Sequence, residues 1–310
     1  MSEADAPCCR QCGSAALDDL GAMPDADVFA AQRLDPPWPG GRLWRCRDCH
    51  LGLRHPVRDE ATYEQLYAQA PDWIWVQRAL RPDQRLVLER IAARGDAGRV
   101  LDVGCYDGAL LAALSPDWTR HGVEASTAAA ARAQALGIDI VASRIRDLPA
   151  VPGLYDVICA VDVIEHLLDP RALVALLAPK LAPGGSLLVS TGDLESPAWR
   201  HAGGAWWYGS FPEHVSFVSS RWARAVAPAL GLELVEAPTF AYDTPHDEAL
   251  LAHRRRRLRR KLLQRRVRSA LPALLRTRRP TRALGEPGLV VDHVLLHLRR
   301  TGDARTATTP

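Results

Sequence analysis

Two pairs of cysteines near the start of the chain have the spacing of metal ligands. In Cys9 with Cys12, and in Cys46 with Cys49, two residues separate the thiols. This spacing lets both thiolates of a turn face one ion, and two such turns complete a tetrahedron around Zn²⁺. Because four thiolates leave no open position, we predict a structural zinc rather than a catalytic one.

The sequence leaves a choice in which residues bind the metal. Cys8 and His50 are alternative ligands beside these pairs, but Cys8 lacks the two-residue spacing to Cys12. An empty or disulfide-bonded site is the other interpretation of the four cysteines.

A glycine-bearing turn follows an apolar run in the middle of the chain. Residues 99–103 predict a short buried strand, and the turn 104–108 leads into a predicted helix at 109–114. Glycines let the backbone approach a ligand, and a helix N-terminus offers free N–H groups. Glu124 ends the next predicted strand, where a carboxylate can accept hydrogen bonds from ribose hydroxyls. The pattern indicates a nucleoside-binding edge of a sheet.

The elements that must position these residues alternate between strands and helices. Further apolar runs predict strands at 138–142, 155–160 and 185–190, and a later strand at 288–298. Such alternation is typical of a parallel sheet that helices cover on both faces.

Four motifs in this part of the chain occur in a fixed order. They are LDVGCYDG (101–108), GVE (122–124), YDVICAVDVIEHLLDP (155–170) and LAPGGSLLVST (181–191). Together they resemble the class I S-adenosylmethionine-dependent methyltransferases. The segments CRQCGS and CRDCHLGLRHPV at the start resemble the zinc-binding leader of a subset of that family, which includes sugar C-methyltransferases of deoxysugar biosynthesis.

The resemblance implies a doubly wound, Rossmann-like α/β fold with a seven-stranded sheet and a small N-terminal zinc ribbon. It also implies S-adenosyl-L-methionine (SAM) as cofactor beside the structural Zn²⁺. The cofactor-binding residues predicted on this basis are Asp102, Gly104, Cys105, Tyr106, Gly108, Glu124, Ile145 and Asp162.

These residues divide by the part of SAM that they would hold. Asp102 and the glycines would hold the methionine end and Glu124 the ribose, while Asp162 would face the cofactor or the acceptor. Two positions depart from the family's pattern. Tyr106 replaces the middle glycine of the turn, and Arg144 stands where an aspartate often faces adenine. The adenine contact is therefore assigned to backbone N–H groups near Ile145, with Asp147 as the alternative.

Two Glu–His pairs are the candidate catalytic residues, since methyl transfer often requires removal of an acceptor proton. His214 is the predicted general base, with Glu213 as its orienter and Trp206, Trp207 and Tyr208 shaping an acceptor pocket. The alternative is that His214 caps or packs against the following helix.

The second pair is Glu165 and His166, which follow the fourth predicted strand. They are either a further acid–base pair or a structural element at the start of the helix predicted at 169–181. Asp169 and Pro170 are typical of the first positions of that helix.

A basic segment follows the catalytic motifs. Residues 249–285 contain no acidic side chain, and leucines recur among arginines at near-helical spacing. This predicts a basic amphipathic helix. Through residues 250–282 it would pack on the enzyme, lie on an anionic membrane surface, or bind a phosphate-bearing substrate.

These patterns divide the chain. We predict a four-cysteine zinc-binding module (1–68), a helical linker (69–97), a SAM-binding catalytic domain (98–245 and 286–300), a basic helical insertion (246–285) and a disordered tail (301–310).

Composition and apolar patterning indicate the expected cellular location of the protein. The 310 residues are 47% hydrophobic and 24% charged, with a net charge of +3, as in ordinary globular proteins. No apolar run approaches the roughly 18 residues of a membrane span, and the first residues lack an apolar signal. We expect a cytoplasmic protein, with peripheral attachment to the inner membrane surface as an open alternative.

The predicted function is methyl transfer from SAM to a small molecule or glycan, such as a nucleotide-sugar or a natural-product or lipid-linked intermediate. One alternative is an RNA methyltransferase that uses the zinc module and basic helix. We expect no nucleic-acid partner, however, because the zinc module is not strongly basic. The other alternative is a catalytically inactive zinc-ribbon interaction protein, suggested by Tyr106 and Arg144.

Overall fold

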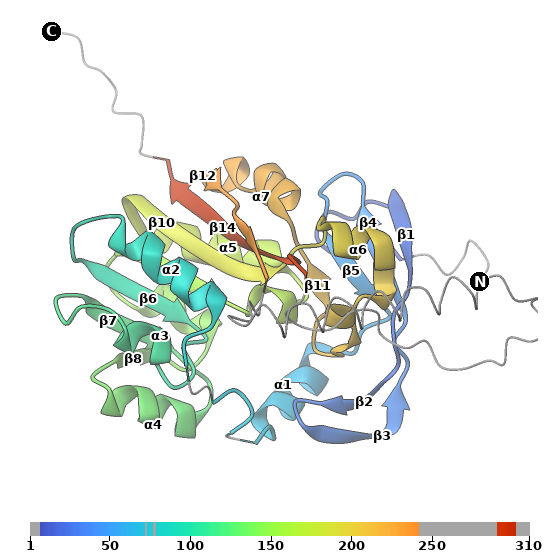
Figure 1. Cartoon of the computed structure of the whole chain (residues 1–310), viewed down its shortest axis with the longest axis horizontal. Helices are drawn as coiled ribbons and strands as arrows, with labels where there is room; N and C mark the ends of the chain where they lie inside the picture. Colours follow the sequence, from blue (N-terminus) through green and yellow to red (C-terminus); the bar gives the residue numbers. More distant parts are fainter. Residues whose placement is uncertain (1–6, 72, 77–78, 242–289, 302–310) are drawn as a thin grey trace, which may run out of the picture.

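The computed structural model describes residues 7–71, 73–76, 79–241 and 290–301 (Figure 1). The basic insertion predicted at 246–285 lies outside these residues, as does the predicted tail beyond Thr301. Within the described part of the chain, no helix is long and apolar enough to cross a membrane.

A central sheet carries the catalytic half of the chain. Its main path has the order β12 (Leu232–Glu236), β14 (His293–Arg300), β10 (Leu181–Gly192), β9 (Tyr155–Val161), β6 (Arg99–Val103), β7 (Thr119–Val123) and β8 (Asp139–Ala142), and the short β13 (Thr239–Phe240) pairs with β14. Strands β10, β9, β6, β7 and β8 are parallel, whereas β14 is antiparallel to both its neighbours. The predicted α/β fold is confirmed, and β13 adds an eighth strand to the seven of the main path.

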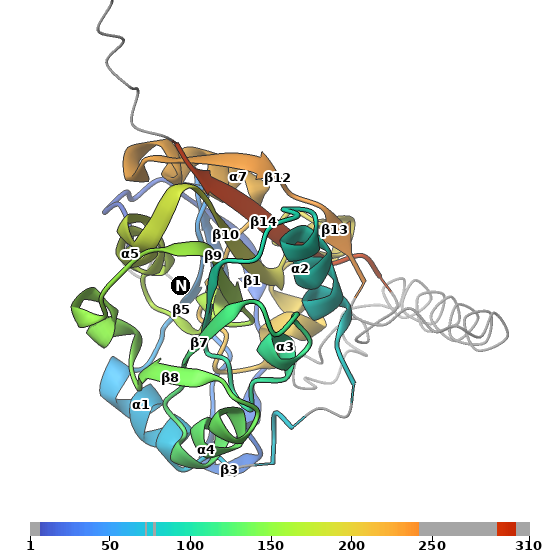
Figure 2. The ribbon, with the colours of Figure 1, turned by 90° about the vertical axis from the view of Figure 1, so that its left-hand side faces the viewer.

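Helices cover both faces of this sheet (Figure 2). On one face lie α2 (Pro82–Ala92), α3 (Ala109–Ala112) and α4 (Thr127–Ala135), and on the other α5 (Pro170–Leu177) and α7 (Ser220–Val226). Successive strand residues point to opposite faces. Accordingly, Val100 packs with α2 and α3, whereas Leu101 and Val103 pack with α5 and α7.

The start of the chain forms a second sheet that includes a strand from the catalytic half. Its order is β1 (Leu17–Ala22), β4 (Arg42–Cys46), β5 (Gly52–His55) and β11 (Ser216–Phe217). A ribbon of β2 (Ala26–Phe29) and β3 (Gln32–Trp38), the helix α1 (Glu60–Ala68) and, from later in the chain, α6 (Pro197–Ala202) lie beside it. Leu51 and Leu53 belong to the same hydrophobic core as Leu101. The cysteine-bearing segment is therefore built into the catalytic half.

The Arg54 guanidinium is one of the groups that join the two parts. This side chain is buried and donates to four main-chain carbonyls. Its Nε contacts His214 O at 3.0 Å, Nη1 contacts Gly40 O at 2.8 Å, and Nη2 contacts Gly209 O at 2.7 Å and Phe211 O at 2.9 Å. The loop before β11 is thereby fixed to β5.

Arg10 makes a similar connection from within the first cysteine pair. Its Nε donates to Leu168 O at 2.8 Å, and Nη1 donates to Arg54 O at 3.0 Å. Its Nη2 donates to Val215 O and lies 3.3 Å from Ser216 Oγ. The turn that carries two of the cysteines therefore also holds β11 and the loop before α5.

Loss of the Arg54 guanidinium should destabilise the fold strongly. We expect Arg54→Leu to lower the free energy of unfolding by about 3 kcal/mol or more, because several buried carbonyls lose their donors. Arg146→Leu is the control, since that side chain is 57% exposed and its 3.5 Å pair with Glu64 contributes about 0.5 kcal/mol at most. Urea denaturation measures both, and equal small losses would contradict the assigned role of Arg54.

Candidate active site

Polar residues from several strands converge at one edge of the central sheet. Parallel strands end at the same edge, so Asp102 of β6, Glu124 after β7, Asp162 after β9 and Thr191 of β10 lie along it. Because β14 is antiparallel, His293 at its start pairs with Gly192 near the end of β10. Ligands of open α/β sheets bind at this edge.

The turn after β6 has the left-handed backbone that its glycines allow. Gly104 and Gly108 have φ values of +75° and +79°, and a Cβ on Gly108 would lie 2.2 Å from Ile138 Cδ1. Tyr106 also adopts a positive φ, +49°. That conformation costs a residue with a side chain roughly 1–2 kcal/mol, so contacts of the ring must offset it.

Glu124 is fixed by the backbone around this turn. Its Oε2 accepts the Tyr106 N–H at 2.9 Å and its Oε1 accepts the Ser126 N–H at 2.7 Å. Burial raises the pKa of the carboxyl, although these N–H groups oppose the change. Each oxygen keeps a further lone pair, so the carboxylate can still accept a ligand hydroxyl.

Asp102 is a buried acid whose carboxylate accepts no hydrogen bond from the described part of the chain. Its side chain is 4% exposed, and no described residue donates a hydrogen bond to the carboxylate. Burial raises its pKa to about 8. A buried carboxyl without a donor is costly, so the site fits a ligand that brings an ammonium group.

Asp162 takes part in an ion-pair network at the same edge. Arg81 Nη2 lies 3.0 Å from Asp162 Oδ2 and 3.0 Å from Oδ2 of the buried Asp83. Burial and the Asp162 charge raise the pKa of Asp83 to about 6. No motif in the sequence pointed to Arg81 or Asp83, which precede β6.

The remaining predicted cofactor residues lie around β7 and β8. Cys105 is buried directly against Gly122 of β7, so its thiol packs inside the fold. Ile145 begins the short helix η2 (Ile145–Ala150) after β8 and is partly buried, whereas Asp147 is exposed.

The structure brings together three of the four side chains in the predicted Glu–His pairs, without the Glu213 carboxyl. Ligand atoms of Glu165, His166 and His214 all lie within 4.8 Å of one another. The two imidazole rings are 5.0 Å apart, measured between centroids. This juxtaposition of segments that are distant in sequence creates one site next to Asp162.

His214 has a defined tautomer. Its Nδ1 lies 2.9 Å from Tyr208 O, and because a carbonyl only accepts, Nδ1 carries the proton and Nε2 the lone pair. Burial and the nearby His166 lower the pKa of the imidazole well below its usual value. Ser219, not His214, caps α7. The expected orienting bond from Glu213 is replaced by the bond to Tyr208 O.

His166 is held by a residue that sequence analysis missed. The Tyr67 hydroxyl of α1 lies 2.7 Å from His166 Nδ1, and Glu213 O lies 3.3 Å from the same atom. Burial lowers the pKa of His166. Asp169 caps α5 through the Ala172 N–H, so neither Glu165 nor His166 is needed for that purpose.

Glu165 accepts hydrogen bonds from two side-chain hydroxyls. Its Oε1 accepts the Tyr208 hydroxyl at 2.6 Å and its Oε2 accepts the Thr191 hydroxyl at 3.0 Å. The side chain is 1% exposed, and burial raises its pKa. The carboxyl therefore anchors Tyr208, against which the His214 ring packs at 4.1 Å between centroids.

A second buried acid anchors the neighbouring tryptophans. Asp292 Oδ2 accepts the indole N–H groups of Trp206 at 3.0 Å and Trp207 at 2.8 Å, and Oδ1 lies 2.7 Å from His293 Nδ1. The three side chains of residues 206–208 are buried, so they form the wall behind the site. The only sequence signal for Asp292 was its position within the strand predicted at 288–298.

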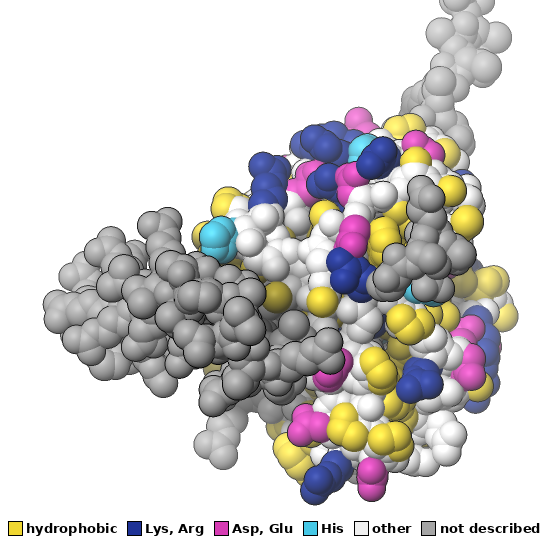
Figure 3. Space-filling model, turned by 90° about the vertical axis from the view of Figure 1, so that its right-hand side faces the viewer, with side chains coloured by type: hydrophobic (Ala, Val, Ile, Leu, Met, Phe, Trp, Pro, Cys, Tyr) yellow, Lys and Arg dark blue, Asp and Glu magenta, His cyan; other side chains and the backbone are white. Residues whose placement is uncertain are grey.

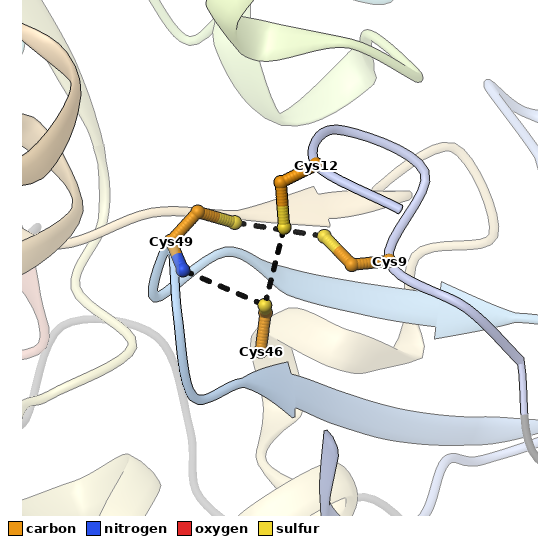
Figure 4. A group of neighbouring side chains, drawn as sticks. All are labelled: Cys9, Cys12, Cys46 and Cys49. Atoms are coloured by element: carbon orange, nitrogen blue, oxygen red, sulfur yellow. Dashed lines mark hydrogen bonds between the residues drawn. The ribbon is translucent and has the colours of Figure 1, made fainter. Parts of the chain in front are cut away.

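The four predicted metal ligands also converge (Figure 4). The sulfurs of Cys9 and Cys49 are 3.5 Å apart, those of Cys12 and Cys46 are 3.6 Å apart, and all four lie within 4.8 Å of one another. Tetrahedral zinc–sulfur bonds of about 2.3 Å place sulfurs about 3.8 Å apart, so the donors fit Zn²⁺. Neither Cys8 nor His50 belongs to this cluster of described residues.

Parts of this chain are similar in sequence to known proteins. A ubiquinone biosynthesis O-methyltransferase of Pectobacterium carotovorum subsp. carotovorum (strain PC1) is 29% identical over 161 residues, 47% of this chain and 67% of that protein. Another, of Parvibaculum lavamentivorans (strain DS-1 / DSM 13023 / NCIMB 13966), is 35% identical over 101 residues, 30% of this chain and 40% of that protein. The chain thus spans two thirds of the first relative and less than half of the second.

Solved structures of similar outline include the N-methyltransferase NodS from Bradyrhizobium japonicum WM9 in complex with S-adenosyl-L-homocysteine (SAH). It is 18% identical, with a TM-score of 0.46 over 78% of this chain and 99% of that chain. The plantazolicin methyltransferase BpumL in complex with SAH is 16% identical, with a TM-score of 0.43 over 71% of this chain and 82% of that chain.

A family model described as a methyltransferase domain matches residues 73–237, which is more than half of the chain. This range contains the glycine turn, the carboxyl edge of β6 to β10 and both Glu–His pairs. The chain therefore belongs to the methyltransferase domain family and is a class I SAM-dependent methyltransferase.

Proposed function

We propose that this enzyme transfers a methyl group from SAM to a small-molecule or glycan acceptor. The observation that carries the proposal is the pair His166 and His214, which lies next to Asp162 at the carboxyl edge of the sheet. The relatives named as ubiquinone biosynthesis O-methyltransferases support a small acceptor. A nucleotide-sugar or a natural-product or lipid-linked intermediate is the acceptor class that we propose, since the leader resembles that of sugar methyltransferases.

The proposed cofactor contacts follow the chemistry of each residue. Asp102 accepts the ammonium of the methionine moiety, and Glu124 accepts the ribose hydroxyls with its remaining lone pairs. The backbone of Gly104 to Gly108 borders the methionine end, and N–H groups near Ile145 serve the adenine. SAM supplies the electrophilic methyl group, and the protein holds it in line with the acceptor.

We assign the proton transfer to His214. Its Nε2 lone pair is available because Nδ1 donates to Tyr208 O, and the low pKa keeps the ring neutral near pH 7. His166, oriented by Tyr67, lies beside it and borders the acceptor. We assign Glu165 the role of an anchor, because its buried carboxyl holds the Tyr208 and Thr191 hydroxyls.

A structural Zn²⁺ in the four-cysteine cluster is part of the proposal. With its ligand shell full, the ion would fix the turn from which Arg10 reaches the loop before α5 and strand β11. It would support the acceptor side of the site without taking part in chemistry.

The face shown in Figure 3 gives no support for an RNA acceptor. On the face shown in Figure 3, basic and acidic side chains are interspersed rather than gathered in a basic patch. A phosphate backbone requires a continuous positive surface. We therefore retain the small acceptor.

The pH dependence of SAM affinity tests the cofactor site. In the free protein Asp102 stays protonated up to pH about 8, so binding an ammonium requires it to lose that proton. Affinity should therefore rise up to about tenfold per pH unit between about pH 6 and 8 and fall again above about pH 8, where the α-amino group loses its own proton.

Calorimetry of wild type, Asp102→Asn and Asp139→Asn measures this dependence. Asp102→Asn should bind weakly with a flat profile. Asp139, 73% exposed at the start of β8, is the control and should leave the profile unchanged. Parallel profiles for wild type and Asp102→Asn would refute the assignment.

Substitution of His214 tests the proposed base. We expect His214→Asn to lower kcat by about 10²–10³ while SAM affinity stays nearly unchanged. The exposed His201→Asn is the matched control. The assay follows labelled methyl transfer from SAM to a panel of catechols and nucleotide-sugars. A His214→Asn enzyme with wild-type kcat on an accepted substrate would rule out the base role.

A further inference from the structure

A short apolar segment between α1 and α2 is exposed beside the cofactor edge. Trp73 is 67% exposed, Trp75 is 40% exposed and Val76 is 47% exposed. Ile74 packs into the core cluster that contains Phe29, so the segment is anchored at this residue. Large exposed apolar side chains in one segment often mark a contact surface.

The side chain of Trp75 reaches the glycine turn of the cofactor site. Its ring meets the Tyr106 ring edge to face, with centroids 5.9 Å apart and an angle of 81°. On its other side it meets the Tyr67 ring at 6.3 Å. Trp75 therefore bridges the cofactor turn and the residue that orients His166.

Tyr106 also contacts α4. Arg132 Nη2 donates to the Tyr106 hydroxyl at 3.3 Å, and Arg132 Cζ lies 5.4 Å from the ring centroid. The Tyr106 main chain is bound to Glu124. The ring thus contacts both α4 and the 73–76 segment.

The backbone conformation of Tyr106 supports a functional role for these ring contacts. A φ of +49° would suit glycine without strain, so a large side chain here is tolerated only because its surroundings hold it. Such strain is concentrated at ligand clamps and switch regions. The side chain that replaces glycine is also the one that contacts Trp75.

We propose that Tyr106 and Trp75 form an aromatic latch across the methionine side of the SAM site, which sets how fast SAM enters and SAH leaves. The proposal rests on the cofactor site proposed at Asp102 and Glu124. Opening the latch breaks the contact between the Trp75 and Tyr106 rings. Closing it shields the bound sulfonium from water.

The test is stopped-flow release of SAH, followed by tryptophan fluorescence in the full-length, zinc-replete protein. Tyr106→Gly removes the ring and relieves the backbone strain, so it should fold at least as stably as wild type. It should release SAH roughly tenfold faster, the factor expected when about one good contact is lost. Trp75→Ala should show the same acceleration. Tyr106→Phe keeps the ring contact and should lie between wild type and Tyr106→Gly.

Trp73→Ala is the matched control, because Trp73 is more exposed and has no ring contact within the described residues. It should release SAH at the wild-type rate. Wild-type release from both Tyr106→Gly and Trp75→Ala, with SAH affinity intact, would overturn the latch and leave the proposed function standing. Failure of the wild-type protein to bind SAH would overturn both.

Discussion

The buried guanidinium of Arg54 is the interaction on which the arrangement of the site depends. It is satisfied by main-chain carbonyls, and burial lowers its pKa only to about 10, so it stays charged near neutral pH. A buried charge must keep its acceptors. The loop from Gly209 to His214 therefore has one conformation, in which His214 faces His166 and its Nδ1 meets Tyr208 O.

The same principle explains the rest of the acceptor side. Glu165 and Asp292 are buried acids, and each is compensated by side-chain donors of the segment 206–208. Polar groups that are fully satisfied rigidify a site, whereas Asp102 lacks a described donor and is left for a ligand. On the cofactor side, the carboxyl edge of the sheet thus keeps a buried carboxylate that no described residue hydrogen-bonds. On the acceptor side, the buried acids are already hydrogen-bonded to neighbouring side chains.

Local patterns in the sequence were sufficient to predict the parallel strands, since buried strands appear as apolar runs. They also identified the cysteine pairs and the Asp169 cap. Local patterns could not predict Tyr67, Asp292 or Arg81, because each acts on residues far away in the sequence through tertiary contacts. For the same reason the pairing of β11 with β5, and the partner of His214 Nδ1, emerged only from the structure.

Hydrogen exchange of the peptide 208–217, with bound zinc and after its removal by a chelator, tests most directly whether the cysteine-bearing turn supports the active site. We predict one zinc per chain, and at least tenfold faster exchange in this peptide after zinc removal, because Arg10 loses its fixed turn. Strand β6 at Arg99–Val103 should keep its protection. Unchanged protection of 208–217 without zinc, or a protein that binds no zinc, would contradict the account.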